Sequence, residues 1–342
     1  MNILIICKGS SKLGLGHLLR SRSFAIHAQQ MHNVKVIAYI DKGLENIFDS
    51  FKINTVFVYN EKAIYNQIRD LNSTVVILDL TDINRSIFIY LRRFASGIVS
   101  ISPIFKYSAE IDILFLRTKN FNKIPKVKII GGLKYSIFNE YCERIEDDKY
   151  FMNLSLKESP IAICMGGADA ANKTLSVLKK LAKIKTKCTF WVLLGAGYSH
   201  SYNELVEVAN ENKQHEIILA KTSRSMWKIL SNSVVAILAG GLTTVEAVFA
   251  GLPTINLFER EAHLDAMSQE LFKRGVCLNG GFFNEKSLNE LSRKIENLLK
   301  NRSKLLKMRE RTLGLVDKQG SKRILKEIDQ FYSYPKKVRN GN

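Results

Sequence analysis

The first half of the chain alternates short apolar runs, rich in β-branched residues, with stretches whose apolar positions recur at helical spacing. A short apolar run predicts a buried strand, and the helical spacing predicts an amphipathic helix. The predicted strands are NILIIC, VKVIAYI, NTVFVY, STVVILDL, SGIVSIS, DILFL and KVKII, and the predicted helices are His17–Gln29, Leu44–Phe51, Lys62–Leu71 and Arg85–Phe94. This repeated switch is typical of βαβ units, in which helices cover both faces of a parallel sheet.

The alternation is interrupted between Cys142 and Ser159, where the chain becomes charged and turn-like before Pro160. Such a change of composition indicates a linker. Beyond it the alternation restarts, with predicted strands IAICM, TFWVLLG, EIILA, VVAILA and PTINLF and predicted helices Lys173–Ile184, Tyr202–Asn212, Ser225–Ser231, Thr243–Ala250 and Leu264–Arg274. The chain after Phe283 is predicted to be helical and basic.

At roughly 150 residues per domain, a length of 342 residues favours two domains. We therefore expect an α/β protein with two doubly wound Rossmann-like domains that face each other across a cleft, where ligands bind at the carboxyl ends of the strands. The expected parts are an N-terminal domain (1–145), a linker (146–159), a C-terminal domain (160–315) and a basic C-terminal helix (316–342). That helix is expected either to cross back onto the first domain or to dock on a membrane.

The chain is strongly basic, with 51 Lys and Arg against 32 Asp and Glu and a formal net charge of +19. Such a charge favours an anionic partner, although a solvated lysine-rich surface without a partner is the alternative. Nucleic acid is the weakest candidate, because no RNA-binding signature or zinc-finger spacing accompanies the charge. Peripheral contact with an anionic membrane is favoured over it, since each basic residue near an anionic leaflet contributes about 1 kcal/mol.

Five cysteines occur without a CxxC pair, which predicts reduced and mostly buried thiols rather than a disulfide scaffold or a zinc site. They are Cys7, Cys142, Cys164, Cys188 and Cys277. The start of the chain, MNILIICKGS, has no basic leader or cleavage site, and no apolar run approaches the ~20 residues needed to span a bilayer. We expect a cytoplasmic protein, with peripheral contact at the inner face of the membrane as an extension of that expectation.

A glycine-rich turn, GSSKLGLGHLLRS (residues 9–21), follows the first predicted strand. It is not a GxGxxG fingerprint, because the third glycine is absent, so a nicotinamide-binding site is disfavoured. Gly14 and Gly16 allow a substrate to approach the backbone, and His17 opens the next helix, with Arg20 one turn further on. An imidazole at a helix N-terminus is held neutral and able to accept a proton. We predict that His17 is a general base; the alternative is a structural residue in a tight turn.

Two further glycine pairs follow strands of the second domain. Gly166 and Gly167 begin GGADAANKT, where exposed amides at a helix start can cradle an anion. Asp169 is assigned to the same site, with helix capping as its alternative role. Gly240 and Gly241 begin GGLTTVEAVFAGLPTINLF at the end of another strand.

The second of these turns carries polar groups suited to a nucleotide. Its predicted binding residues are Gly240, Gly241, Leu242, Thr243, Thr244 and Glu246. Thr243 and Thr244 can donate to phosphate, and the Glu246 carboxylate can accept from ribose hydroxyls; a first-turn acid on the helix dipole is the alternative role of Glu246. Because both glycine pairs should meet at one edge of the sheet, we expect domain 160–315 to bind a nucleoside diphosphate.

The segment GGLTTVEAVFAGLPTI resembles the donor-binding helix of the peptidoglycan N-acetylglucosaminyltransferase and its relatives, which are nucleotide-sugar enzymes of GT-B type. The resemblance implies that Glu246 holds the ribose and that Gly241 to Thr244 lie near the diphosphate. Together with GGLKYSIFNEY (131–141) and MGGADAANKT (165–174), the turn around His17 looks most like the pseudaminic acid pathway UDP-sugar hydrolase and the related spore-coat polysaccharide proteins. The match covers most of residues 1–280.

That resemblance implies hydrolysis of UDP-2,4-diacetamido-2,4,6-trideoxy-β-L-altropyranose to UDP and the free sugar, in nonulosonic acid or surface polysaccharide biosynthesis. His17 would activate the water, and amides of Gly166, Gly167 and Gly241 would stabilise the diphosphate, with no cofactor and no metal. The implied substrate-binding residues are Gly14, Gly16, Arg20, Asp79, Tyr135, His263 and Asp265.

The chain departs from the hydrolase pattern in three places. The usual Arg-x-Asp before the glycine-rich turn is Ile6-Cys7-Lys8, the usual Asp-x-Tyr is Asp79-Leu80-Thr81, and the usual Asn-Gln pair is replaced within Glu259–Asp265. The nucleotide-binding residues are thus kept and the sugar-contacting ones changed. A GT-B glycosyltransferase with a membrane-linked or glycan acceptor is therefore the alternative function, with His17 deprotonating an acceptor hydroxyl. A basic binding or scaffold protein without activity is a third.

Overall fold

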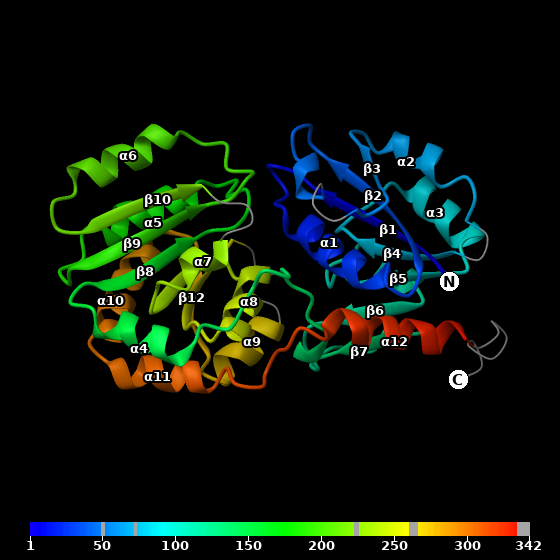
Figure 1. Ribbon diagram of the computed structural model, residues 1–342. Coiled ribbons are helices and arrows are strands. Elements are labelled where there is room, and N and C mark those ends of the chain that lie inside the picture. The colour runs from blue at the N-terminus through cyan, green and yellow to red at the C-terminus, as the bar shows by residue number, and fades with distance from the viewer. Residues whose placement is uncertain (49–51, 72–73, 222–225, 260–265, 334–342) are drawn as a thin grey trace. The chain divides into compact units, whose positions relative to one another are not determined.

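The computed structural model describes residues 1–48, 52–71, 74–221, 226–259 and 266–333 (Figure 1). The chain divides into two compact units, each built on one sheet. The first comprises Met1–Ser10, Gly16–Asn139 and Asp317–Asn342, and the second comprises Ser11–Leu15 and Glu140–Val316. The chain therefore returns to the first unit at its C-terminal end.

The first unit contains a sheet whose described strands are all parallel and run in the order β3-β2-β1-β4-β5-β6-β7. The strands are β1 (Asn2–Gly9), β2 (Asn33–Ile40), β3 (Thr55–Val58), β4 (Thr74–Asp79), β5 (Gly97–Ser100), β6 (Ile113–Leu116) and β7 (Lys128–Gly131). The chain winds outward from β1 to β3 and then starts again at β4 on the other side of β1. In such a sheet the point where the winding reverses, here between β1 and β4, is where ligands bind.

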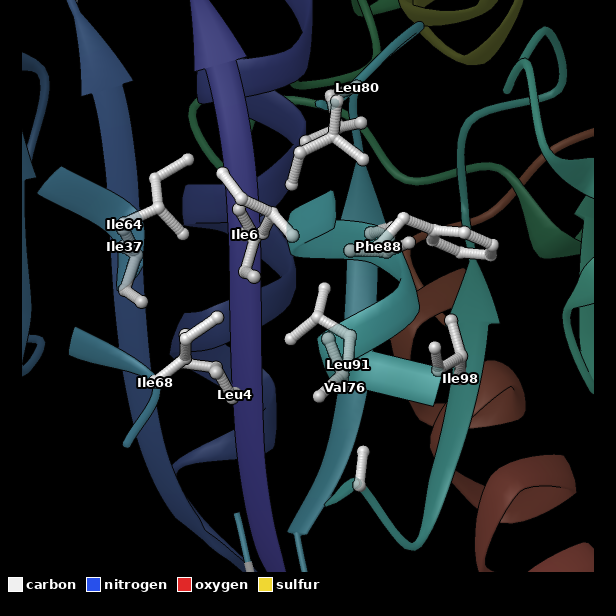
Figure 2. Packing of buried hydrophobic residues seen from close by; sticks show 14 of the residues in the cluster. Leu4, Ile6, Ile37, Ile64, Ile68, Val76, Leu80, Phe88, Leu91 and Ile98 are labelled. Atoms are coloured by element: carbon white, nitrogen blue, oxygen red, sulfur yellow. The ribbon is translucent and has the colours of Figure 1, made fainter. Parts of the chain in front are cut away.

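Helices cover both faces of this sheet. They are α1 (Gly16–Ala28), α2 (Lys62–Gln67), α3 (Arg85–Phe94) and α12 (Gly320–Tyr332), with 3-10 turns η1 (Glu45–Ile47), η2 (Ser108–Glu110) and η3 (Leu133–Tyr135). Figure 2 shows Phe88 and Leu91 of α3 packed against the sheet in one buried cluster with Ile6 and Val76. Because successive strand side chains point to opposite faces, the buried neighbours of these strand residues face the other side, where α1 packs against β1 and α12.

The second unit contains a sheet whose described strands are also parallel, in the order β10-β9-β8-β11-β12-β13. The strands are β8 (Ser159–Cys164), β9 (Cys188–Leu194), β10 (Glu216–Lys221), β11 (Val235–Leu238), β12 (Thr254–Phe258) and β13 (Cys277–Phe282). The helices are α4 (Asp147–Ser155), α5 (Lys173–Leu181), α6 (Tyr202–Glu211), α7 (Met226–Leu230), α8 (Leu242–Ala250), α9 (Ala266–Lys273), α10 (Glu285–Leu299) and α11 (Arg302–Glu310). Here the winding reverses between β8 and β11.

The predicted α/β architecture with two doubly wound parallel sheets is confirmed, and most elements lie where the periodicity places them. Strand β13 was not predicted, because Asn279-Gly280-Gly281 interrupts its apolar run; a register shift opposite Asn256 accommodates these residues. The predicted helix Leu44–Phe51 is only the 3-10 turn η1, and residues 49–51 lie outside the described part of the chain.

The charged segment predicted as a turn-like linker forms helix α4 instead. Its Tyr150 is buried and donates to the carbonyl of Val234 at 2.9 Å, and Asn153 Nδ2 donates to the carbonyl of Ser231 at 2.9 Å. These two buried side chains hold α4 in place although most of its residues are polar, because packing rather than propensity supplies most helical stability.

The C-terminal helix α12 belongs to the first unit and is held there by polar contacts. Tyr135 donates to Glu327 Oε1 at 3.0 Å, Arg323 donates to the carbonyl of Lys134 at 2.9 Å, and Tyr332 donates to Asp112 Oδ2 at 3.2 Å. All five cysteines are free and buried, as predicted. Over the described residues, no helix combines the length and apolar character needed to cross a membrane.

The contact between Tyr332 of α12 and Gly97 of β5 gives a stability prediction. A methyl group at Gly97 would collide with the Tyr332 ring, so we expect Gly97→Ala to lower the free energy of unfolding by about 1–3 kcal/mol, the usual cost of overpacking. Urea denaturation measures this. Gly16→Ala is the control, because no described atom lies within 4 Å of its added methyl group. Equal stability of both variants would show that Tyr332 does not seat α12.

Candidate functional site

The glycine-rich turn of the first unit lies at the point where the winding reverses. It follows β1, while Asp79 is the last residue of β4, the strand paired with β1. Cys7 of β1 is the register partner of Asp79. His17 is the second residue of α1, the helix that leaves this turn. Two residues 62 positions apart in sequence are thereby brought to one edge of the sheet.

His17 and Asp79 form a hydrogen-bonded pair. The imidazole Nδ1 lies 2.7 Å from Asp79 Oδ1, and the side chains are 19% and 0% exposed, respectively. An ionised carboxylate can only accept, so the contact with Asp79 requires the proton on Nδ1, although Arg20 Nη2, which is also a donor, lies 3.0 Å from the same atom. The other ring nitrogen, Nε2, then has the lone pair that can take up a proton. The pair therefore fixes the tautomer that a general base needs.

Two more donors hold the Asp79 carboxylate. Arg20 donates from Nε to Oδ2 at 3.0 Å and from Nη2 to Oδ1, and Ser21 Oγ donates to Oδ2 at 3.1 Å. Burial by itself would raise the pKa of Asp79, but the charges and hydrogen bonds of Arg20 and His17 outweigh it and lower that pKa to about 2. Asp79 is therefore a fixed anion that accepts from His17, Arg20 and Ser21.

Three residues expected to bind substrate have partners within the first unit. Asp79 and Arg20 are both buried, Arg20 is paired with Asp79, and Asp79 also accepts from His17. Tyr135, also expected at the substrate, is buried and donates to Glu327 of α12. The assignment of these three residues to the substrate stays a prediction.

Four other residues are expected to bind substrate, and two of them lie in the described part of the chain. Gly14 has a φ of +90°, and no described atom lies within 4 Å of a methyl group added at Gly14 or Gly16, so both backbones are open to approach. Gly14 belongs to the segment Ser11–Leu15, which groups with the second unit, whereas Gly16 belongs to the first. His263 and Asp265 lie outside the described residues.

In the second unit, both glycine pairs lie where the winding reverses. Gly166 and Gly167 follow β8, and Gly240 and Gly241 follow β11, its neighbour in the sheet. Gly166 has a φ of +106°, which favours glycine, and nothing described lies within 4 Å of an added methyl group. The predicted convergence of the two turns at one sheet edge therefore follows from the strand order.

The first turn is braced by the loop after β9. Gly197 donates its amide to the carbonyl of Gly167 at 2.9 Å, and a methyl group at Gly195 would collide with Gly167. Tyr198 donates to Asn172 Oδ1 at 2.9 Å, and His200 Nε2 lies 2.8 Å from the carbonyl of Asp169. The backbone of the turn is thus held before any ligand arrives.

Asp169 takes the capping role that was its alternative. Its Oδ1 accepts from the amide of Lys173 at 2.9 Å and its Oδ2 from the amide of Thr174 at 2.8 Å, at the start of α5. Burial raises the pKa of Asp169 despite these bonds. Because the cap uses these two amides, an anion at this turn would have to bind amides that precede Lys173.

The second turn differs from the expectation at Thr244. That residue is buried, and its hydroxyl donates to Asn256 Oδ1 at 3.1 Å rather than facing a phosphate. Leu242 and Thr243 are partly exposed, and Gly241 has no described atom within 4 Å of an added methyl group. Gly240 has a structural reason to be glycine, because its φ is +72° and a side chain would collide with Phe258.

Glu246 is buried in α8 and receives a hydrogen bond that sequence reasoning missed. Trp227 Nε1 of α7 donates to Glu246 Oε2 at 3.2 Å. A buried carboxylate oriented by an indole can bind a ribose, which is the predicted role, or it can only accept the indole hydrogen bond within the core. The two residues lie 19 positions apart in different elements, so no spacing rule joins them.

An ion pair between a buried lysine and a partly exposed glutamate, near the same turns, was also missed. Lys173 Nζ lies 2.9 Å from Glu259 Oε2, and Glu259 directly follows β12. Within the described ranges, no three His, Cys, Asp or Glu side chains are grouped so as to hold a metal ion.

Comparison with known proteins supports the architecture. No protein-family model matches the chain. The uncharacterized protein MJ1062 of Methanocaldococcus jannaschii is 24% identical over 287 residues, which cover 80% of this chain and 59% of the relative. The chain thus spans about three fifths of that relative's length.

Solved structures resemble the whole chain at low sequence identity. MurG of Acinetobacter baumannii is 13% identical with a TM-score of 0.60, covering 96% of this chain and 99% of its own. A putative UDP-N-acetylglucosamine 2-epimerase of Listeria monocytogenes is 13% identical with a TM-score of 0.65, covering 98% and 97%. Alr3699/HepE of Anabaena, solved with UDP-glucose, is 11% identical with a TM-score of 0.64, covering 96% and 100%. The fold is of GT-B type.

The Asp79 contacts predict how stability depends on pH. Asp79→Asn should lower the free energy of unfolding at neutral pH by about 3–5 kcal/mol, because it leaves the buried Arg20 charge without its partner. The folded-state pKa of Asp79, about 2, lies below the ordinary value of ~3.9. The stabilisation is therefore complete above pH ~4 and is lost as the pH falls toward 2.

Urea denaturation of the wild type and the variant between pH 2.5 and 7 measures this difference, which should shrink below pH 4. Asp82→Asn is the matched control, since Asp82 is half exposed and pairs with Lys106 at the surface, where such pairs contribute about 0–1 kcal/mol. A difference that does not depend on pH would contradict the assigned ion pair.

Proposed function

We propose that this protein is a nucleotide-sugar hydrolase that releases a nucleoside diphosphate and a free sugar. The observation that carries the proposal is the His17–Asp79 pair, an imidazole held in its base-competent tautomer by a fixed anion. It lies at the edge of the first sheet where ligands of doubly wound folds bind. The resemblance to the pseudaminic acid pathway hydrolase assigns the base to the same residue.

The nucleotide is proposed to bind the second unit. Gly166, Gly167 and Gly241 present backbone at the point where the winding of that sheet reverses, and bare amides there suit a diphosphate. Glu246 is proposed to accept hydrogen bonds from the ribose, with Trp227 orienting its carboxylate. UDP is the proposed nucleotide, which agrees with the UDP and UDP-glucose bound in Alr3699/HepE, a protein of the same fold.

The proposed reaction is a displacement at the anomeric carbon. The water oxygen forms a bond to that carbon while His17 Nε2 takes a proton from the water. The bond between the anomeric carbon and the diphosphate oxygen breaks, and its electron pair leaves with UDP. Asp79 stabilises the imidazolium that forms, as the carboxylate does in a Ser-His-Asp triad, and the turn amides stabilise the leaving diphosphate.

The sugar proposed from the resemblance is 2,4-diacetamido-2,4,6-trideoxy-β-L-altropyranose. The altered sugar-side motifs favour a related but different sugar, because Thr81 stands where the hydrolase motif Asp-x-Tyr has its tyrosine. A screen of UDP-, GDP-, CMP- and dTDP-sugars by thermal shift identifies the nucleotide and narrows the sugar, because ligand binding stabilises the fold by mass action.

Glycosyl transfer is the second candidate. The same base would deprotonate an acceptor hydroxyl instead of water, and peripheral contact with an anionic membrane would bring a lipid-linked acceptor. The observation that favours it is the exposed basic surface around α11, formed by Lys300, Arg302, Lys304, Lys307 and Arg311. UDP release from candidate UDP-sugars decides between the two: release without an acceptor supports the hydrolase, and release only with an added acceptor or membranes supports the transferase.

His17→Asn tests the base. The asparagine amide can still donate to Asp79 but has no counterpart of Nε2, so we expect turnover to fall by about 10²–10⁴-fold while UDP affinity stays unchanged. Steady-state UDP release and calorimetry measure the two quantities. His27→Asn on the same helix is the control, since its Nδ1 lies 2.9 Å from the Ser23 carbonyl and it has no assigned chemistry. Unchanged turnover in His17→Asn would remove the role of this residue.

Glu246→Ala tests the nucleoside site. We expect UDP binding to weaken by about 1–3 kcal/mol, the cost of losing a charged hydrogen-bonding partner. Trp227→Phe should weaken it less, because it removes only the donor that orients the carboxylate. Isothermal calorimetry with UDP measures both, and an alanine variant that binds UDP as the wild type does would place the nucleoside elsewhere.

A further inference from the structure

The Lys173–Glu259 ion pair of the second unit lies among the strand ends that the proposed function uses. Lys173 is the first residue of α5, in the turn after β8, and its side chain is 5% exposed. Glu259 follows β12 and is 39% exposed. Between these two strands lies β11, whose end carries the Gly240–Gly241 turn. The 2.9 Å contact between Lys173 Nζ and Glu259 Oε2 therefore joins the carboxyl ends of strands on either side of that turn.

The position of Lys173 is electrostatically unfavourable for a residue that only fills the core. The first turn of a helix is the positive end of its dipole, which disfavours a cation, and burial removes the ammonium from water. A well-packed apolar side chain of similar volume often matches or exceeds the stability of a buried ion pair. Asp169 lies close enough to attract the ammonium, but its two oxygens accept from the amides of Lys173 and Thr174, and the salt bridge of Lys173 is made with Glu259.

We propose that Lys173 is the cation that binds the diphosphate of the nucleotide, and that Glu259 occupies it when no nucleotide is bound. This inference rests on the proposed function, because it places the phosphates at the Gly166–Gly167 and Gly240–Gly241 turns. Glu259 is the half of the pair that can leave, since its side chain is more than a third exposed while that of Lys173 is buried. An arriving diphosphate exchanges one anionic partner of the ammonium for another.

The exchange predicts opposite effects for the two halves of one ion pair. Glu259→Gln removes the competing charge, so UDP should bind about two- to fivefold more tightly, in keeping with a partly exposed pair. Lys173→Met keeps most of the aliphatic stem but removes the charge, so UDP should bind tenfold or more weakly, the scale of a lost charge-assisted hydrogen bond. A purely structural pair would not give effects of opposite sign.

The experiment is calorimetry of both variants and the wild type with UDP, uridine and inorganic pyrophosphate. UDP and pyrophosphate should shift in the stated directions, and uridine should not respond. Glu158→Gln is the matched control, because Glu158 pairs with Lys187 at 2.6 Å in the same unit but outside the two glycine turns, and it should leave all three affinities unchanged. Thermal unfolding of each variant shows whether it is folded.

If Lys173→Met does not fold, Glu259→Gln alone tests the inference. This variant is expected to fold, since it replaces a partly exposed carboxylate with an amide of the same shape. Unchanged or weaker UDP and pyrophosphate binding in Glu259→Gln overturns the inference. Suppose that the wild type binds pyrophosphate but no nucleotide, and that the two variants shift the pyrophosphate affinity in the stated directions. The inference about Lys173 then stands and the proposed function fails. If the wild type binds neither pyrophosphate nor any nucleoside diphosphate, both fail.

Discussion

The buried carboxylate of Asp79 is the group on which the candidate site of the first unit depends. It is fully enclosed at the end of β4, and the charges and hydrogen bonds of Arg20 and His17 lower its pKa, while Ser21 also donates to it. A buried anion tolerates few arrangements of its partners, since each lost bond exposes the full cost of the buried charge. The same constraint that holds α1 against β4 therefore also fixes the tautomer and direction of the His17 imidazole.

The two units apply one topological rule twice. In each sheet the winding reverses between its first and fourth strands, β1 and β4 in one and β8 and β11 in the other. The neighbouring chain segments leave in opposite directions at that point, which leaves the strand ends uncovered. In the first unit this edge carries the His17–Asp79 pair, and in the second it carries two glycine turns and the Lys173–Glu259 ion pair. The proposed hydrolysis or transfer of a nucleotide-linked sugar would use the first as a proton acceptor and the second to bind the diphosphate.

Local features of the chain can be recognised in its sequence, whereas long-range contacts cannot. His17 and the four glycines of the second unit stand out as candidates, because a helix start or a tight turn is formed by consecutive residues. Asp79 was expected to bind substrate, but its position at the end of β4, the strand beside β1, brings its carboxylate to His17. The contact of Tyr135 could not be predicted for the same reason, since its partner Glu327 lies 192 residues away in the returning helix.

The sequence by itself determined the succession of strands and helices, the two-sheet architecture and the positions of the glycine turns, because hydrophobic periodicity and backbone conformation are properties of neighbouring residues. Only the tertiary structure decided which polar side chains satisfy one another. Whether Thr244 faces a ligand or Asn256, and whether Lys173 meets Glu259, depends on strand order and burial. A buried polar group must find a partner wherever the fold brings one, and that partner is set by distance in space, which the order of residues along the chain does not record.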